Sequence, residues 1–286
     1  MSAEAADVFV AAGRASGLKP LLQRASRLAP KALRLAVAAW FVVAMLGQWL
    51  MAAYVLVLYG GVTLRGDPAG WNQVMEHGHV AGEPVGNAVV VGHVGFAFVV
   101  LLGGALQAIP AIRRRWPVLH RWNGRVYLAA VALMCLGGLA MQLTRASLQT
   151  FVFTSALILD VAMTVGFGWL AWRSARARRF DAHRRWALRT FVAASAQWVF
   201  RISLMLWIVV NQGPAGFDPD TFEGPTTTVL AFAQFLLPLA LLELYFRAQA
   251  AGPRLQWAAA GVLGSTALAT AGGIAAAAMI LWLPRM

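Results

Sequence analysis

Cysteine is almost absent from this chain of 286 residues, which has a single one, Cys135. One cysteine forms no disulfide within a chain and builds no cysteine-based metal site. Cys135 lies within an apolar run, where a thiol usually serves as a small packed side chain. We therefore expect Cys135 to be buried and to carry no chemistry.

Charged residues are scarce as well. They make up 12% of the sequence, whereas hydrophobic residues make up 60% and the mean hydropathy is +0.65. An ordinary soluble domain has about twice that share of charged residues with which to cover its surface. The composition therefore excludes a soluble globular protein and indicates an integral membrane protein.

The motifs of common soluble enzymes are missing. The sequence has no Walker A loop, no HExxH zinc motif and no GxSxG elbow in a workable position. Ser155 and Ser203 lie inside apolar runs without a nearby base. The basic residues flank apolar runs and are not interleaved with stacking aromatics on a soluble face, so no nucleic-acid binding is expected. The sequence leaves open whether the protein catalyses any reaction.

Seven apolar runs are long enough to cross a membrane as helices. A hydrocarbon core of about 30 Å needs about 20 residues at a rise of about 1.5 Å per residue. The runs are residues 33–60, 87–110, 121–144, 149–172, 186–211, 227–247 and 255–283. We predict an all-α integral membrane bundle of about seven transmembrane helices, built from residues 32–286.

The N-terminal region differs from these runs. Between residues 5 and 28, apolar side chains alternate with four basic ones, a pattern typical of an amphipathic helix on a membrane surface. Pro30 is expected to end this helix before the first span. Residues 1–31 are therefore predicted to form a surface arm, with a disordered basic tail as the alternative. They lack the features of a cleaved signal peptide, so we expect an uncleaved anchor.

Basic residues alternate from one side of the predicted spans to the other. Six lie in residues 1–34, five in 111–125, seven in 173–189 and two in 247–254. The opposite side carries Arg65, Arg145 and Arg285. Because basic loops are retained in the cytoplasm, we predict a cytoplasmic N-terminus and an external C-terminus. The predicted location is the bacterial inner (cytoplasmic) membrane.

Two segments rich in histidine, arginine and tryptophan lead into the third and fifth spans. Residues 118–127 read VLHRWNGRVY and residues 181–191 read DAHRRWALRTF. The similarity of these two segments predicts that spans two and three form a hairpin related to the hairpin of spans four and five. The alternative is coincidence, because the positive-inside bias alone would place arginines in both segments. Four polar residues of these segments are then expected at the cytoplasmic edge of the membrane: His120, Arg125, His183 and Arg189.

Polar side chains inside the spans are costly unless they are paired, so each is a candidate functional residue. Asp160 and Arg201 lie at similar counted depths in adjacent spans, and we predict an intramembrane ion pair between them. This pair would either fix the register between the two helices or take part in the function of the protein. Further polar residues in the outer halves of their spans complete a predicted cluster with it: His93, Gln142, Gln197 and Gln234.

The first outer loop contains two histidines near carboxylates. The sequence Glu76-His77-Gly78-His79 is followed by Glu83. A His-x-His pair near acids is able to hold zinc or copper. His93 is the candidate third ligand if the loop folds back over the bundle. A metal site of His77, His79 and His93 is therefore one hypothesis.

Several of these residues also carry a family resemblance. They are Gly92-His93 before a Gly-rich span, Leu106-Gln107, the His120–Tyr127 segment, the His183–Arg189 segment and Arg201. With them, about residues 87–247 resemble the bacterial membrane-protein family called domain of unknown function 2306 (DUF2306). Ala187 stands where the family usually has methionine. The resemblance implies a multi-span inner-membrane protein and no established activity.

Three functions are compatible with these features. The first, our working hypothesis, is a structural or partner-binding membrane subunit that contacts anionic lipid headgroups, with another membrane protein or a second copy as partner. The second is a transporter or proton-handling protein that uses a cavity around His93, Asp160 and Arg201. The third is a redox protein that holds haem b, with arginines near the propionates. Its candidate residues are His93, His120, His183, Arg125 and Arg189.

Overall fold

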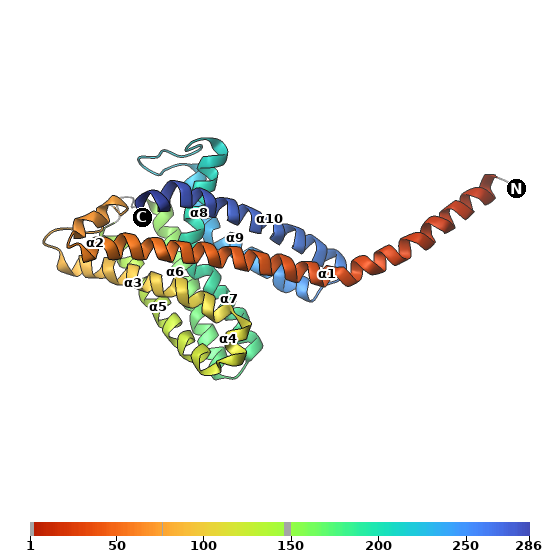
Figure 1. The fold of residues 1–286 in the computed structure, drawn as a ribbon, viewed down its shortest axis with the longest axis horizontal. Helices are drawn as coiled ribbons and strands as arrows, with labels where there is room; N and C mark the ends of the chain where they lie inside the picture. The colour runs from red at the N-terminus through yellow and green to blue at the C-terminus, as the bar shows by residue number, and fades with distance from the viewer. Residues whose placement is uncertain (1–2, 76, 146–149) are drawn as a thin grey trace. The chain divides into compact units, whose positions relative to one another are not determined.

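The computed structural model describes residues 3–75, 77–145 and 150–286, with side chains described from residue 23 onward. Within these residues the chain is helical and contains no strand, so the predicted all-α class is confirmed. In chain order the elements are α1 (Ala3–Val55), η1 (Leu56–Gly60), α2 (Gly61–Leu64), η2 (Pro68–Gln73), α3 (Pro84–Ala108), α4 (Pro110–Arg115), α5 (Pro117–Thr144), α6 (Phe151–Arg176), α7 (Phe180–Ala194), α8 (Ala196–Asn211), α9 (Pro225–Gln249), α10 (Pro253–Ala277), η3 (Ala278–Trp282) and η4 (Leu283–Arg285) (Figure 1).

Five α-helices of the described residues begin at a proline. Proline suits the first helical position because its missing N–H would have no partner there and its fixed φ already matches a helix. The sequence therefore sets the starts of α3, α4, α5, α9 and α10, at Pro84, Pro110, Pro117, Pro225 and Pro253.

Helix α1 is longer than the sequence predicted. It runs without interruption from Ala3 to Val55 and passes through Pro30, so the expected break between a surface helix and the first span is wrong. Proline removes one backbone hydrogen bond, and a helix can continue past it where its neighbours re-satisfy the freed groups. Whether residues 5–28 lie on a membrane surface stays a prediction.

Six helical segments are long and apolar enough to cross a membrane: Gln23–Leu64, Pro84–Ala108, Pro117–Thr144, Phe151–Arg176, Pro225–Gln249 and Pro253–Arg285. The predicted fifth span is instead a pair of helices, α7 and α8, bent by 50°. Ser195 lies at the bend, and its hydroxyl donates a 2.8 Å hydrogen bond to the Phe191 carbonyl. Such back-bonding bends helices. The multi-span bundle is confirmed, with six spans, or seven if the bent pair crosses as one.

The chain forms two compact units. One contains α1 up to Val43 together with Leu241–Ala269, and the other contains Ala44–Ala240 and Thr270–Met286. In the first unit the Trp257 indole N–H donates a 3.1 Å hydrogen bond to the Ala25 carbonyl. Small side chains let these helices pack closely around a buried core of Leu33, Ala248, Ala259, Ala260 and Leu263.

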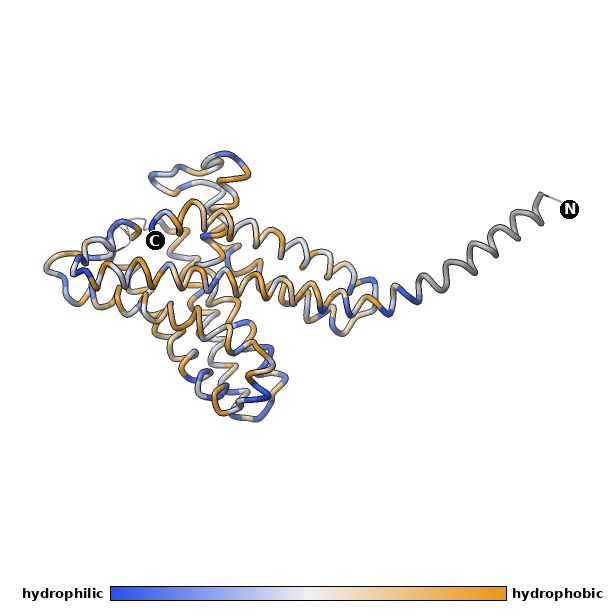
Figure 2. Tube along the Cα trace, in the orientation of Figure 1, coloured by the Kyte–Doolittle hydropathy of each residue, from blue (hydrophilic) through white to orange (hydrophobic). Residues whose placement is uncertain are grey.

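The second unit contains two antiparallel hairpins, α3 with α5 and α6 with α7, and α5 packs against α6 (Figure 1). Their core includes Cys135, which is free and buried as expected. Both hairpins turn at the same end, where α4, the start of α5, the end of α6 and the start of α7 meet. Figure 2 shows hydrophilic residues gathered there. We call this region, residues 110–125 and 169–189, the arginine end.

Candidate functional sites in the second unit

His93 of α3 packs its ring against α5. Its Nδ1 lies 2.8 Å from the carbonyl oxygen of Met134. Because a carbonyl can only accept, Nδ1 carries a proton, and Nε2 of the neutral ring is left as an acceptor. A Cβ at Gly138 would lie 3.0 Å from His93 Cε1, so a larger residue here would press against the ring. The ring is thus fixed at the contact between α3 and α5.

Arg201 of α8 lies near two tyrosines of the first span. Its Nη1 donates a 3.0 Å hydrogen bond to the carbonyl of Gln197, one turn earlier on the same helix. Its positive charge interacts electrostatically with Tyr54 of α1 and Tyr59 of η1, and also with His93. Arg201 is half-buried and Gln197 is exposed. The guanidinium therefore lies beside α1.

Asp160 of α6 has a different neighbour. Its carboxylate accepts a 3.4 Å hydrogen bond from Thr164 of its own helix and interacts electrostatically with Cys135 of α5. The expected Asp160–Arg201 ion pair is not formed. The ion pair that the structure does show joins Arg145 and Glu83. The sequence prediction of this intramembrane pair is wrong.

The contact between two aromatic rings explains why Asp160 and Arg201 lie apart. Phe200 of α8 meets Phe153 of α6, with ring centroids 6.0 Å apart. Arg201 follows Phe200 by about 100° around the helix, so its side chain leaves the face of α8 that contacts α6. Asp160 comes seven residues after Phe153, which puts its backbone about 10 Å further along α6. The counted depths agreed because each was measured from the end of its apolar run, and the Phe153–Phe200 contact shows that these two ends are not level.

The other members of the predicted polar cluster also have separate partners. The Gln142 amide donates a 3.4 Å hydrogen bond to the Thr154 hydroxyl, across the contact between α5 and α6. Gln234 of α9 is buried, and its amide donates to the Ala231 carbonyl of its own helix. The structure therefore brings together His93, Gln197 and Arg201 but leaves Gln142, Asp160 and Gln234 in other contacts.

The first predicted outer loop is held by Arg145, which follows α5. The guanidinium of Arg145 forms an ion pair with Glu83 at 2.8 Å and donates to the Asn87 side-chain oxygen at 2.9 Å. It also donates to the carbonyls of His77 and Gly78, at 3.1 and 3.5 Å. No sequence pattern singled out Arg145, because its partners lie about sixty residues earlier in the chain.

This network does not assemble the predicted metal site. In the described part of the chain, no three histidine, cysteine or acidic side chains are grouped as metal ligands would be. The backbone of His77 is tied to Arg145 and that of His79 to Asn72, while His93 is engaged with Met134. The expected grouping of His77, His79 and His93 is therefore not formed. Glu76 lies outside the described residues.

The histidines of the arginine end lie close to one another. His183 Nδ1 is 2.9 Å from the Ala171 carbonyl of α6, which fixes its ring and leaves Nε2 as an acceptor. The carbonyl of His120 accepts a 2.9 Å hydrogen bond from Gln107, and its ring interacts electrostatically with His183. The buried His120 Nδ1 has no hydrogen-bond partner. Haem b binding by these rings stays a prediction, which an absorbance spectrum of the purified protein would test.

Arginines lie over tryptophan rings at the same end. Five such pairs occur among the described residues, with distances from the guanidinium carbon to the ring centroid of 4.6 to 5.7 Å. They are Arg115–Trp116, Arg125–Trp122, Arg173–Trp169, Arg176–Trp172 and Arg189–Trp186. Four have a spacing of three or four residues, which puts both side chains on one helix face. That spacing is visible in the sequence and was a signal by which these arginine–tryptophan pairs could have been predicted.

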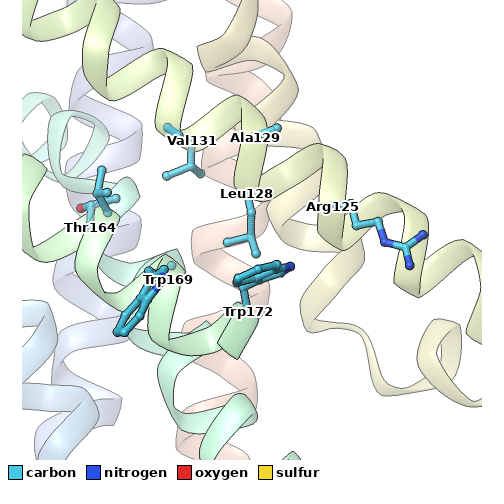
Figure 3. Close-up of a pocket in the computed structure, with 10 residues that line it drawn as sticks. Arg125, Leu128, Ala129, Val131, Thr164, Trp169 and Trp172 are labelled. Atoms are coloured by element: carbon cyan, nitrogen blue, oxygen red, sulfur yellow. The ribbon is translucent and has the colours of Figure 1, made fainter. Parts of the chain in front are cut away.

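An apolar groove between α5 and α6 opens beside these pairs. It has a volume of about 350 Å³ and is lined by Leu128, Val131 and Ala132 on one side and by Val165, Gly168 and Trp169 on the other. Figure 3 shows Leu128 and Trp172 facing each other, with Arg125 at one end and Thr164 further in. The groove thus combines apolar walls with a cationic end.

Comparison with known proteins identifies the family. Residues 90–246 match the family model described as "Predicted membrane protein (DUF2306)". The chain belongs to the DUF2306 family. The DUF2306 region contains the arginine–tryptophan pairs, the groove, His93, Asp160 and Arg201, whereas Tyr54, Tyr59 and the Arg145-bound loop backbone precede it. The family resemblance is therefore confirmed. No curated protein and no solved structure matches the chain.

Proposed function

We propose that this protein is a membrane subunit that binds anionic lipid headgroups at its arginine end. The observation that carries this proposal is the set of five arginine–tryptophan pairs at one end of the α3–α7 bundle. Tryptophan favours the boundary between hydrocarbon and headgroups, and arginine donates hydrogen bonds to phosphates in a fixed fork. A ring beneath each guanidinium holds it at that boundary.

The charge balance of this end supports the same ligand. Residues 111–125 and 173–189 together contain twelve arginines, against one acid, Asp181. A cluster of this kind attracts anionic lipids, at about 1 kcal/mol for each basic residue near the surface. The groove between α5 and α6 would take an acyl chain, with the headgroup beside Arg125. The arginine bias also supports a cytoplasmic position for this end, in a bacterial inner membrane.

A vesicle experiment tests the proposal. The full-length protein is reconstituted in membranes of phosphatidylcholine alone or with added phosphatidylglycerol, and its thermal unfolding midpoint is measured. We expect phosphatidylglycerol to raise the midpoint, less so in high salt, because ligands that bind the folded state stabilise it and salt screens charges. Equal midpoints in the two membranes would contradict the proposal.

Two matched double variants show which part of the protein is responsible for the lipid-dependent shift of the unfolding midpoint. The double variant Arg125→Gln, Arg176→Gln removes two guanidinium groups that stack on Trp122 and Trp172. Its control, Arg65→Gln, Arg285→Gln, removes the same charge from exposed residues outside the arginine end. We expect the first variant to lose most of the lipid-dependent shift and the control to keep it. If both lose it equally, net charge rather than this end determines lipid binding.

A further inference from the structure

Helices α1 and α8 run side by side in a fixed register. The buried Gln48 of α1 donates a 2.9 Å hydrogen bond to the Ser195 hydroxyl at the start of α8. A Cβ at the neighbouring Gly47 would lie 2.8 Å from the Trp198 ring, so the two helices are in close contact here. Six residues beyond Gln48 and Ser195 come Tyr54 and Arg201, whose side chains interact electrostatically. The register thus sets a tyrosine beside an arginine inside the bundle.

The charge of Arg201 has no acidic partner. Its hydrogen bond goes to a backbone carbonyl, and no acidic side chain of the described residues forms an ion pair with it. A cation within a membrane span is costly and is normally paired or placed where it binds an ion or substrate. The tyrosines beside it add hydroxyl donors and no negative charge. The site as built by the protein is therefore cationic.

Two unpartnered polar groups lie at the same position. Tyr54 is only 4% exposed, and its buried hydroxyl has no hydrogen-bond partner. Its ring lies 6.5 Å from that of Trp282, which is fully buried and whose indole N–H is also unpartnered. Buried polar groups in proteins are nearly always satisfied, so such groups call for a ligand or another explanation. Here both can donate a hydrogen bond to an anion.

We propose that Arg201 and Tyr54, with Tyr59 beside them, bind the carboxylate group of an organic monoacid. A guanidinium matches a carboxylate in a two-bond fork, and a phenolic hydroxyl can donate a third bond. One carboxylate neutralises the charge of Arg201, while Arg285, which also interacts electrostatically with Tyr54, donates to the carbonyls of Ile280 and Leu281.

Binding is measured on the full-length protein in a neutral detergent. Benzoate tests a water-soluble acid and laurate tests a membrane-derived one, with benzyl alcohol and dodecanol as uncharged analogues. The readout is the thermal unfolding midpoint as a function of ligand concentration, with calorimetry for the dissociation constant. We expect at least one acid to raise the midpoint and its alcohol to have no effect. If neither acid binds, or if the alcohol binds as well as its acid, the proposal is overturned.

Variants separate binding from folding. Arg201→Gln is expected to weaken acid binding at least tenfold, and Arg65→Gln, which removes an exposed arginine, to leave it unchanged. Tyr54→Phe keeps the ring and removes only the unpartnered hydroxyl, so the free protein should fold as well as the wild type while binding the acid several-fold more weakly. Acid binding by Tyr54→Phe and Arg201→Gln at the wild-type strength would refute the site. These variants lie outside the arginine end and leave its lipid response unchanged.

Discussion

Gln48 donates a 2.9 Å hydrogen bond to the hydroxyl of Ser195, which itself donates to the Phe191 carbonyl. The bond joins α1 to the bend between α7 and α8, although 147 residues separate its partners in the chain. It also sets the register that brings Tyr54 beside Arg201. The bend and the candidate carboxylate site therefore share one polar contact.

Replacing Gln48 tests the contact directly. Gln48→Leu keeps the volume and removes the donor, and we expect it to lower the free energy of unfolding by about 1 kcal/mol, the usual size of an interhelical hydrogen bond in membranes. Gln73→Leu, at an exposed residue, should change it far less. Thermal unfolding of the two purified variants in one detergent gives the comparison. Equal midpoints would mean that the bond does not hold α1 to the bend.

Arg145 is predicted to hold the loop before α3. Arg145→Gln removes an ion pair and hydrogen bonds to Asn87 and to two loop carbonyls, and we expect a loss of about 2 kcal/mol in the free energy of unfolding. Glu83→Gln should cost less, about 0.5 kcal/mol, because the Glu83 side chain is 59% exposed and its ion pair is screened by solvent. Limited proteolysis of the 65–83 loop provides a second measurement. A larger loss from Glu83→Gln than from Arg145→Gln would contradict this prediction.

A glycine of α10 is predicted to be irreplaceable. A Cβ at Gly273 would lie 2.7 Å from the carbonyl oxygen of Ile202 in α8, and a backbone atom cannot rotate away. Gly273→Ala should therefore cost about 1–3 kcal/mol of stability through overpacking. Gly264→Ala, in the same helix but with open space around its Cβ, should leave stability unchanged or raise it, since alanine favours helices. Similar unfolding midpoints for the two variants would contradict the close contact of α8 with α10.

The orientation in the membrane is tested by cysteine labelling. Cys135 is the single cysteine and is buried, so Cys135→Ala gives a background without reactive thiols. In that background we expect Ala215→Cys, in the exposed loop after α8, to react with a membrane-impermeant maleimide on intact cells. Ala177→Cys, in the turn between α6 and α7, should react only after the cells are opened. The reverse pattern would place the arginine end outside.

Much of the fold could be predicted from the sequence because it depends on local chemistry. Long apolar runs bounded by prolines gave most of the helices, and the burial of Cys135 followed from its surroundings. Pro30 was misleading because a proline inside a long helix need not end it. The bend at Ser195 was missed because a serine bends a helix only through a specific bond to the preceding turn.

The sites were harder to predict than the spans. Counting residues from the ends of apolar runs gave Asp160 and Arg201 the same depth, but it said nothing about which way each helix is rotated. The contact of Phe153 with Phe200 decides that rotation and turns Arg201 toward Tyr54. Likewise, the partners of His93 and His183 are backbone carbonyls of neighbouring helices, which no side-chain motif can reveal.

The sequence by itself determined that the protein is a bundle of membrane helices, because hydropathy and the prolines at helix starts act over a few neighbouring residues. Its histidine and arginine motifs, and not its hydropathy, carried the resemblance to the DUF2306 family. It also determined where arginine accumulates, since that depends on composition alone. Only the tertiary structure decided which polar groups meet. Helix rotation, the bend at Ser195 and the close glycine contacts arise from packing between distant segments, and they are what separates Asp160 from Arg201.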